Sequence, residues 1–290
     1  MTSLGRYRLD RVLGAGSFAT VWKGYDPELD IPVAVKVLAD NWSLDADVRQ
    51  RFLTEARLLR RIVSDRVVRV HDVGLADERP YFVMDYVAGG TLADRVGTLD
   101  PAEALRLTIE AGRAVQVLHE AGVVHRDVKP ANLLLDDAVE PARVLVGDLG
   151  SVKLLADATG LTLTTGTPAY MAPEQATGSV GFDARADVYA LGVLGYELVA
   201  GRRPAEVPDA GPVAAAAPRG LPAEVDAVLS AALQRDRRAR PADAGAFADR
   251  LTAAATGAGT GRRDGWRLSV VLGLAVLLFA LSATLAWLLR

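Results

Sequence analysis

Five side chains that could carry out acid–base and phosphate chemistry lie within eight residues of one another. They are His125, Arg126, Asp127, Lys129 and Asn132, and they directly follow an apolar pair of valines. A carboxylate can accept the proton of a hydroxyl group, an ammonium group can neutralise a phosphate, and a carboxamide oxygen can hold a metal ion. The spacing therefore indicates a loop that handles a hydroxyl, a phosphate and a metal ion together.

The order of these residues resembles the catalytic loop of the eukaryotic-type protein kinases, in which an Asn follows the His-Arg-Asp triplet. The resemblance implies that Asp127 orients the substrate hydroxyl and accepts its proton. It also implies that Lys129 steadies the transferring phosphate and that Asn132 holds a magnesium ion. The run Asp-Val-Lys-Pro is similar to the serine/threonine branch of the family. A nearby histidine, His119, is expected to pack or cap rather than to catalyse.

A glycine-rich segment near the N-terminus is similar to the nucleotide-binding loop of the same family. Gly14 and Gly16 would let the backbone bend tightly and approach a phosphate closely, although a Gly-x-Gly sequence alone also fits a plain hairpin turn. The strand-like run after it favours a kinase loop over a dinucleotide-binding turn, which should open a helix. Ala19 replaces the family's third glycine. The expected ATP contacts here are Leu13, Gly14, Ala15, Gly16, Ser17 and Val21.

Lys36 and Glu55 are predicted to pair. Lys36 lies in Val-Ala-Val-Lys, which resembles the kinase strand whose Lys contacts the α- and β-phosphates, and Ala34 in the same run would also contact the nucleotide. Glu55 lies nineteen residues later, in a helix expected over 45–61. A strand lysine can instead place its tip in solvent, and Glu55 could pair with a surface arginine of its own helix.

Residues 85–90 resemble the hinge between the two lobes of a kinase. The resemblance implies that backbone groups near Asp85 and Val87 meet adenine, next to Met84. Two adjacent glycines at the end of this segment fit a hinge, because its backbone dihedrals must change as the lobes open and close.

Gly147-Asp148-Leu149-Gly150 is similar to the Asp-Phe-Gly motif of the family. Asp148 would then be the main metal ligand, because magnesium prefers oxygen ligands and bridges the phosphates of ATP. Leu149 stands where the family has Phe, and either side chain can fill the apolar spine behind the site. The expected cofactors are ATP and Mg2+, and Mn2+ could take the same place.

The segment Gly166–Gln175 matches the end of the kinase activation loop. By resemblance, Thr167 hydrogen-bonds near Asp127, and Glu174 makes a buried ion pair with Arg240. Asp187, at the start of a strongly apolar helix, resembles the buried anchor that binds the backbone of the catalytic loop. This segment also disfavours a small-molecule phosphotransferase, because it is a peptide-substrate feature.

Threonines precede that segment and are candidates for phosphorylation. They are Thr162, Thr164 and Thr165. A phosphothreonine could pair with Arg126 and order the loop. The alternative is a solvated threonine-rich loop, and this alternative is expected to hold for at least one of the three.

Composition narrows the class of protein further. The chain has 290 residues, no cysteine and a net charge of −3. Disulfides, thiolate catalysis and cysteine-based zinc sites are therefore excluded, and the overall charge gives no electrostatic case for nucleic-acid binding. The expected partners are ATP and protein substrates.

The predicted fold is α+β and bilobal: a small β-sheet lobe with one main helix, and a mostly helical second lobe. The predicted kinase domain spans 7–252, with an N-lobe over 7–84, the hinge over 85–90 and a C-lobe over 91–252. The N-lobe is expected to hold a five-stranded sheet, with strands that include 67–70 and 81–84. Two helices, near 222–234 and 241–254, are expected to close the domain.

The C-terminal region is predicted to anchor the chain in a membrane. A short linker over 253–267 precedes 22 residues without a charge, 268–289. A helix of that length is about 33 Å long and can cross roughly 30 Å of hydrocarbon. Arg262, Arg263 and Arg267 precede the span, so the single-pass protein is expected to keep its kinase domain on the cytoplasmic face of the cell membrane. Small residues on the span could pack two copies into a homodimer.

The leading hypothesis is a membrane-anchored bacterial serine/threonine protein kinase. The alternative from another class is a pseudokinase that acts as a membrane-tethered scaffold. Ala19, Leu149 and a short region over 201–220 favour that alternative. It is opposed by four intact residues, which are Lys36, Asp127, Asn132 and Asp148.

Overall fold

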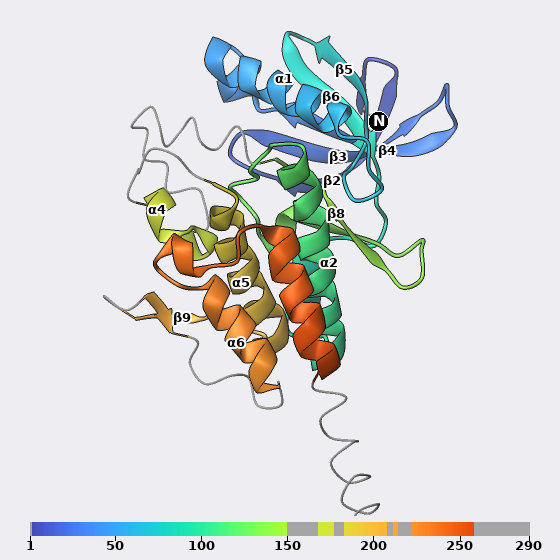
Figure 1. Cartoon of the computed structure of the whole chain (residues 1–290). Coiled ribbons are helices and arrows are strands. Elements are labelled where there is room, and N and C mark those ends of the chain that lie inside the picture. Colours follow the sequence, from blue (N-terminus) through green and yellow to red (C-terminus); the bar gives the residue numbers. More distant parts are fainter. Residues whose placement is uncertain (1, 150–167, 177–182, 208–210, 214–221, 258–290) are drawn as a thin grey trace, which may run out of the picture.

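The computed structural model describes residues 2–149, 168–176, 183–207, 211–213 and 222–257. A β-sheet and the helix α1 form one lobe, and a bundle of helices forms the other (Figure 1). The chain passes from the first lobe to the second after Asp85, where the last strand of the sheet ends. The two-lobed α+β architecture predicted from the sequence is confirmed.

The N-lobe sheet is antiparallel and has six strands in the order β1-β2-β3-β4-β6-β5. The strands are β1 (Thr2–Leu4), β2 (Tyr7–Ala15), β3 (Ala19–Asp26), β4 (Ile31–Leu38), β5 (Val70–Ala76) and β6 (Arg79–Asp85).

Two details of the predicted sheet were wrong. The five-stranded sheet omitted β1, whose three residues are too short for a periodic signal. The strand predicted over 67–70 begins only at Val70, because Val67 and Val68 are buried and bond to another strand. The Val68 amide donates to the Val146 carbonyl at 3.0 Å, so this short segment joins the sheet lobe to the helical lobe.

The central strand β4 is buried on both sides and therefore sorts its side chains by alternation. Val33, Val35 and Val37 pack into one apolar cluster, while Ala34 and Leu38 belong to the main core on the opposite face. Lys36 shares the face of Ala34 and Leu38. Strand geometry thus directs its ammonium group toward α1.

Helix α1 (Ala46–Arg61) begins at Asp45, whose carboxylate accepts the amides of Asp47 and Val48, each at 3.0 Å. This N-cap satisfies amides that the first turn leaves unpaired. The buried face carries Val48, Phe52, Glu55, Ala56 and Leu59. Helical spacing therefore carries one carboxylate, Glu55, into an otherwise apolar interface.

The second lobe is built on α2 (Pro101–Glu120) and α5 (Arg185–Ala200), with α6 (Ala223–Ala232) and a last helix over 244–257 (Figure 1). The last two helices confirm those predicted near 222–234 and 241–254. Gly195 permits close packing, since a Cβ there would lie 2.7 Å from a methyl of Thr108 on α2.

The remaining strands and the short helix are β7 (Leu133–Asp136), β8 (Arg143–Val146), α4 (Pro173–Ala176), β9 (Ala205–Val207) and β10 (Gly211–Val213). The 3-10 helices are η1 (Asp40–Trp42), η2 (Leu92–Arg95), η3 (Pro130–Asn132), η4 (Pro168–Tyr170) and η5 (Arg237–Ala239).

Within the described ranges, the structure has no helix that combines the length and the apolar character needed to cross a bilayer. The span predicted over 268–289 lies outside these ranges.

Candidate active site

The loop before β7 brings two predicted catalytic residues and one predicted metal ligand into direct contact. The Lys129 ammonium lies 2.8 Å from Asp127 Oδ2. Asn132, at the end of η3, donates its side-chain amide to the Asp127 carbonyl at 2.8 Å and to Asp127 Oδ2 at 3.0 Å. The Asp127 carboxylate is thus held in place by a cation and a carboxamide.

Asp187 on α5 holds this loop from below. Its two carboxylate oxygens accept the amides of His125 and Arg126, each at 2.7 Å. Asp187 is buried, and Arg126 has a φ of 68°, a conformation that costs a side-chain-bearing residue energy. Hydrogen bonds to a buried carboxylate are strong enough to offset that strain. The contacts match the anchor that the sequence predicted.

His119 packs as predicted, and it also bridges two helices. One ring nitrogen lies 2.9 Å from Asp187 Oδ2, and the other accepts the amide of Ala244 at 3.2 Å. The catalytic loop is therefore tied through Asp187 and His119 to the start of the last helix. Sequence reasoning missed this link, because nothing local connects His119 with a residue 125 positions away.

Lys36 lies between two carboxylates. Its Nζ is 2.8 Å from Glu55 Oε1 and 3.0 Å from Asp148 Oδ1. The side chains of Lys36 and Glu55 are almost fully buried, whereas that of Asp148 is 39% exposed. The structure therefore assembles the predicted ion pair and adds Asp148 to it.

This arrangement shifts the pKa values of Lys36, Glu55 and Asp148. Burial raises the pKa of Glu55 to about 8, and the charge of Asp148 adds to that effect while Lys36 opposes it. Burial also works against ionisation of Asp148, but the Lys36 ammonium holds the pKa of Asp148 well below its usual range. Burial lowers the pKa of Lys36, yet Asp148 and Glu55 outweigh it and raise that pKa above its ordinary value. The pKa values of the two acids beside Lys36 thus shift in opposite directions.

Asn132 and Asp148 are brought side by side by the β7–β8 hairpin, because the Gly147 amide donates to the Asn132 carbonyl at 3.0 Å. Both amide hydrogen bonds of the Asn132 side chain go to Asp127, which leaves its Oδ1 for another ligand. Oxygen donors of this kind suit Mg2+, which commonly takes one or two protein ligands and completes its shell with phosphates and water. In the described part of the chain, no group of three or more His, Cys, Asp or Glu residues forms a metal site of its own.

The glycine-rich turn and the hinge carry the other predicted nucleotide contacts. A Cβ at Gly14 would meet no atom within 4 Å, and neither Gly14 nor Gly16 has a positive φ. Open space above the turn, rather than backbone strain, is therefore what these glycines provide. The sheet places Val21 opposite Lys36 and Ala34 opposite Met84, which gathers the predicted nucleotide contacts in one region. Leu13, Ala15 and Ser17 lie exposed around the same turn.

Asp85 was predicted to offer backbone groups to adenine, but its side chain also makes contacts within the sheet lobe. Its carboxylate accepts the Arg69 amide at 3.0 Å and lies 2.7 Å from His71 Nε2, while its own amide donates to the Arg69 carbonyl. Asp85 is thus bound to β5 and the segment before it. Val87 packs, partly buried, against the main core.

Glu174 and Arg240 form the predicted buried pair. The two guanidinium nitrogens of Arg240 lie 2.7 and 2.9 Å from the two carboxylate oxygens, and the Arg240 side chain is 0% exposed. Gln175 adds a contact that the sequence did not suggest, since its amide donates to the Arg126 carbonyl at 3.1 Å. The short helix α4 is therefore fixed both to the C-lobe and to the catalytic loop. Leu149 is buried in the main core, as expected of a spine residue.

Four predicted positions lie outside the described residues. They are Thr162, Thr164, Thr165 and Thr167.

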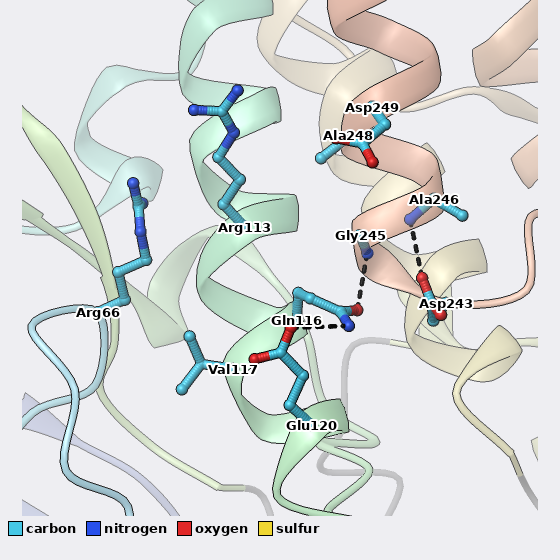
Figure 2. A pocket seen from close by; sticks show the side chains of 10 residues that line it. All are labelled: Arg66, Arg113, Gln116, Val117, Glu120, Asp243, Gly245, Ala246, Ala248 and Asp249. Atoms are coloured by element: carbon cyan, nitrogen blue, oxygen red, sulfur yellow. Dashed lines mark hydrogen bonds between the residues drawn. The ribbon is translucent and has the colours of Figure 1, made fainter.

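A surface hollow lies apart from these residues, between α2 and the last helix (Figure 2). Gln116 spans its floor and accepts the amide of Gly245 at 2.8 Å, while Arg66 and Arg113 line one side. Both arginines approach the same carboxylate, Glu110, at 2.6 and 3.7 Å. The hollow contains none of the predicted catalytic, metal or nucleotide residues.

The sheet lobe carries a Lys-Glu pair, and the helical lobe carries an Asp-Lys-Asn loop and a further Asp that contacts the Lys. This is the architecture of a kinase. The chain belongs to the protein kinase family: the family model described as "Protein kinase domain" matches residues 7–241.

Relatives and solved structures agree with this assignment to the protein kinase family. Serine/threonine-protein kinase PknJ of Mycobacterium tuberculosis is 38% identical over 279 residues, which cover 90% of this chain and 46% of PknJ. PknA of the same organism is 37% identical over 89% of this chain and 63% of its own length. The crystal structure of the M. tuberculosis PknI kinase domain superposes with a TM-score of 0.69 at 30% identity, over 87% of this chain and 98% of that domain. The chain thus spans about half the length of PknJ.

Proposed function

We propose that this chain transfers the γ-phosphoryl group of ATP to serine and threonine hydroxyls of proteins. The observation that carries the proposal is an intact set of five residues in two contacting groups: Lys36 with Glu55 and Asp148, and Asp127 with Asn132. The backbone bond from Gly147 to Asn132 joins the two groups. The names of the relatives, which are serine/threonine-protein kinases, support the substrate class.

Each residue has a role that follows from its position. Lys36 holds the α- and β-phosphates, because its ammonium is fixed between Glu55 and Asp148. Asp127 orients the attacking hydroxyl and accepts its proton, while Lys129, whose ammonium lies 2.8 Å from the Asp127 carboxylate, neutralises charge on the transferring group. Catalysis of this kind comes mainly from positioning and from charges that are already in place.

Mg2+ would be held by Asn132 Oδ1 and the Asp148 carboxylate, where it would neutralise charge on the phosphates of ATP. The adenine ring would lie against Val21, Ala34 and Met84 and bond to the hinge carbonyl of Asp85. Intact metal and phosphate ligands give no support to a pseudokinase scaffold.

Two finer parts of the proposal concern regions outside the described residues. Phosphorylation of Thr162, Thr164 or Thr165 by the kinase itself would add a phosphate that can pair with Arg126 and order the loop before Thr167. The uncharged stretch 268–289 would anchor the protein in the cell membrane, with the kinase domain in the cytoplasm and with room for a homodimer.

The test is labelled-phosphate transfer from ATP to the chain itself and to a generic protein acceptor, with and without Mg2+. Acid hydrolysis of the product should yield phosphoserine or phosphothreonine. Label on tyrosine alone, or none in any acceptor under conditions where nucleotide binds, would contradict the proposal.

A further inference from the structure

The tip of the glycine-rich turn rests on a tryptophan that belongs to none of the motifs. Trp42 ends η1, between β4 and α1. Its Nε1–H donates to the Ser17 carbonyl at 3.0 Å, and its ring centroid lies 5.1 Å from that of Phe18, with the planes tilted by 33°. The Ala39 amide, three residues earlier, donates to the Phe18 carbonyl at 2.9 Å. Two hydrogen bonds and one aromatic contact thus attach the turn to η1.

These bonds occupy carbonyl groups and leave amides available. The Gly16 amide is used within the turn, where it donates to the Ala19 carbonyl at 2.9 Å. In the part of the chain that the structure describes, the amides of Ser17 and Phe18 have no hydrogen-bond partner. A phosphate is bound by N–H groups and repelled by carbonyl oxygens. The attachment therefore holds the repulsive groups back and leaves the donors for a phosphate.

The same tryptophan is joined to the helix that presents Glu55. The carbonyl of Trp42 accepts the amide of Asp45 at 3.2 Å, and Asp45 is the N-cap of α1. One turn further, the Arg49 guanidinium donates to the Ser43 carbonyl at 3.0 Å. The turn and α1 are thus connected through one short segment, residues 42–45.

We propose that Trp42 is a positioning residue for nucleotide binding: it fixes the glycine-rich turn in a phosphate-ready conformation and couples that turn to α1. The proposal rests on the proposed phosphotransferase function. It assigns no chemistry to Trp42 itself, which acts through the backbone of Ser17 and Phe18.

A purely space-filling role for the indole ring makes a different prediction. Trp42 and Phe18 both pack, partly buried, against the main core. Trp42→Phe keeps an aromatic ring against Phe18 but removes the N–H that binds Ser17, whereas Trp42→Leu removes both contacts. The pair of variants therefore separates the hydrogen bond from the packing.

Trp22→Phe is the matched control. Trp22 lies on β3 in the same lobe, and it packs against the apolar cluster of Val33, Val35 and Val37 on the face away from Lys36. The control makes the same substitution in the same lobe without removing a contact to the turn. It should leave the KM for ATP at the wild-type value.

In the full-length chain, Trp42→Phe should raise the KM for ATP about 3- to 10-fold, the range expected for one net hydrogen bond, and Trp42→Leu should raise it further. The kcat should change by less than about two-fold, because the contact is present both in the ATP-bound enzyme and in the transition state. Tryptophan fluorescence should respond to ATP in the wild type and in Trp22→Phe, and this response should be lost in Trp42→Phe.

Wild-type KM values in both Trp42 variants would overturn the proposal, as would a loss of kcat with KM unchanged. If the wild type transfers no phosphate, the dissociation constant for ATP measured by calorimetry replaces KM, and the same ratios apply. Failure of the kinase function is then seen as absent transfer, while failure of the positioning role is seen as equal affinity in all variants. A wild type that binds no nucleotide contradicts both.

Discussion

The ammonium group of Lys36 contacts two carboxylates that differ in burial and in the direction of their pKa shifts. Glu55 is buried and has its pKa raised to about 8, whereas Asp148 is partly exposed and has its pKa lowered by Lys36. The pKa values of the two acids therefore shift in opposite directions although both contact the same Nζ. Such divergence between neighbouring acids is typical of functional sites.

The shift at Glu55 predicts a pH-dependent stability. The folded-state pKa, about 8, lies above the ordinary value of 4.5, so the contribution of Glu55 is complete below 4.5 and is lost as the pH rises through 8. Glu55→Gln cannot titrate. Measured without added nucleotide, the melting temperature of the wild type relative to Glu55→Gln should fall between pH 5 and pH 8 and then level off.

The comparison between the two proteins cancels the other titrating groups, because these are shared. Asp148 titrates well below this window. Parallel melting curves for the two proteins from pH 5 to pH 9 would show that Glu55 carries an ordinary pKa.

At this residue scale, much of the site could be predicted from the sequence. The pairs Lys36–Glu55 and Glu174–Arg240 follow from motifs in which residue type and order are both constrained. Trp42, Gln175 and His119 could not be found in the same way. Each of them makes a hydrogen bond with a backbone group, and backbone groups carry no residue-specific signal in the sequence.

At the scale of elements, the β7–β8 hairpin and the helices α4 and α5 converge on the catalytic loop. Asp187 of α5 binds the backbone of that loop, and Gln175 of α4 reaches the carbonyl of Arg126. The position of α4 depends in turn on Arg240, which also donates to the carbonyls of Gln234 and Arg185.

Breaking the Glu174–Arg240 pair should therefore be costly. Arg240→Met keeps much of the side-chain volume but leaves the Glu174 carboxylate largely buried without its cation, and it should lower the free energy of unfolding by about 3–5 kcal/mol. Arg113→Met is the control, since Arg113 is 47% exposed and lies 3.7 Å from Glu110. It should change stability by less than about 1 kcal/mol.

Chemical denaturation of the three proteins measures both values. Equal small losses for Arg240→Met and Arg113→Met would mean that the buried pair contributes no more than a surface pair does.

The sequence was less informative about elements than about residues. Periodicity predicted α1 and the two last helices, because their apolar faces repeat over many residues. It failed for β1, which is three residues long, and for 67–70, where two buried valines resemble a strand but cross between the lobes.

At the scale of the whole molecule, the described ranges form a kinase domain, and the proposed anchor follows them. Two charges at the centre of the stretch 268–289 should prevent membrane insertion, since each arginine there costs about 2.5–3.5 kcal/mol. The full chain carrying Leu277→Arg and Leu278→Arg should leave the membrane pellet after an alkaline wash. Leu277→Ile with Leu278→Ile should remain in the pellet with the wild type. Wild-type protein in the supernatant would refute the anchor.

The central claim is that this chain is an active kinase and not a binding scaffold. The most direct measurement follows ATP binding and phosphate transfer on the same preparations of wild type, Asp127→Asn and Lys36→Met. We predict that Asp127→Asn binds ATP like the wild type but transfers phosphate about 10²- to 10⁴-fold more slowly, since it loses the group that accepts the proton. Lys36→Met should lose transfer through its missing phosphate contact. Equal transfer rates in all three proteins, or ATP binding without transfer in the wild type, would contradict the account.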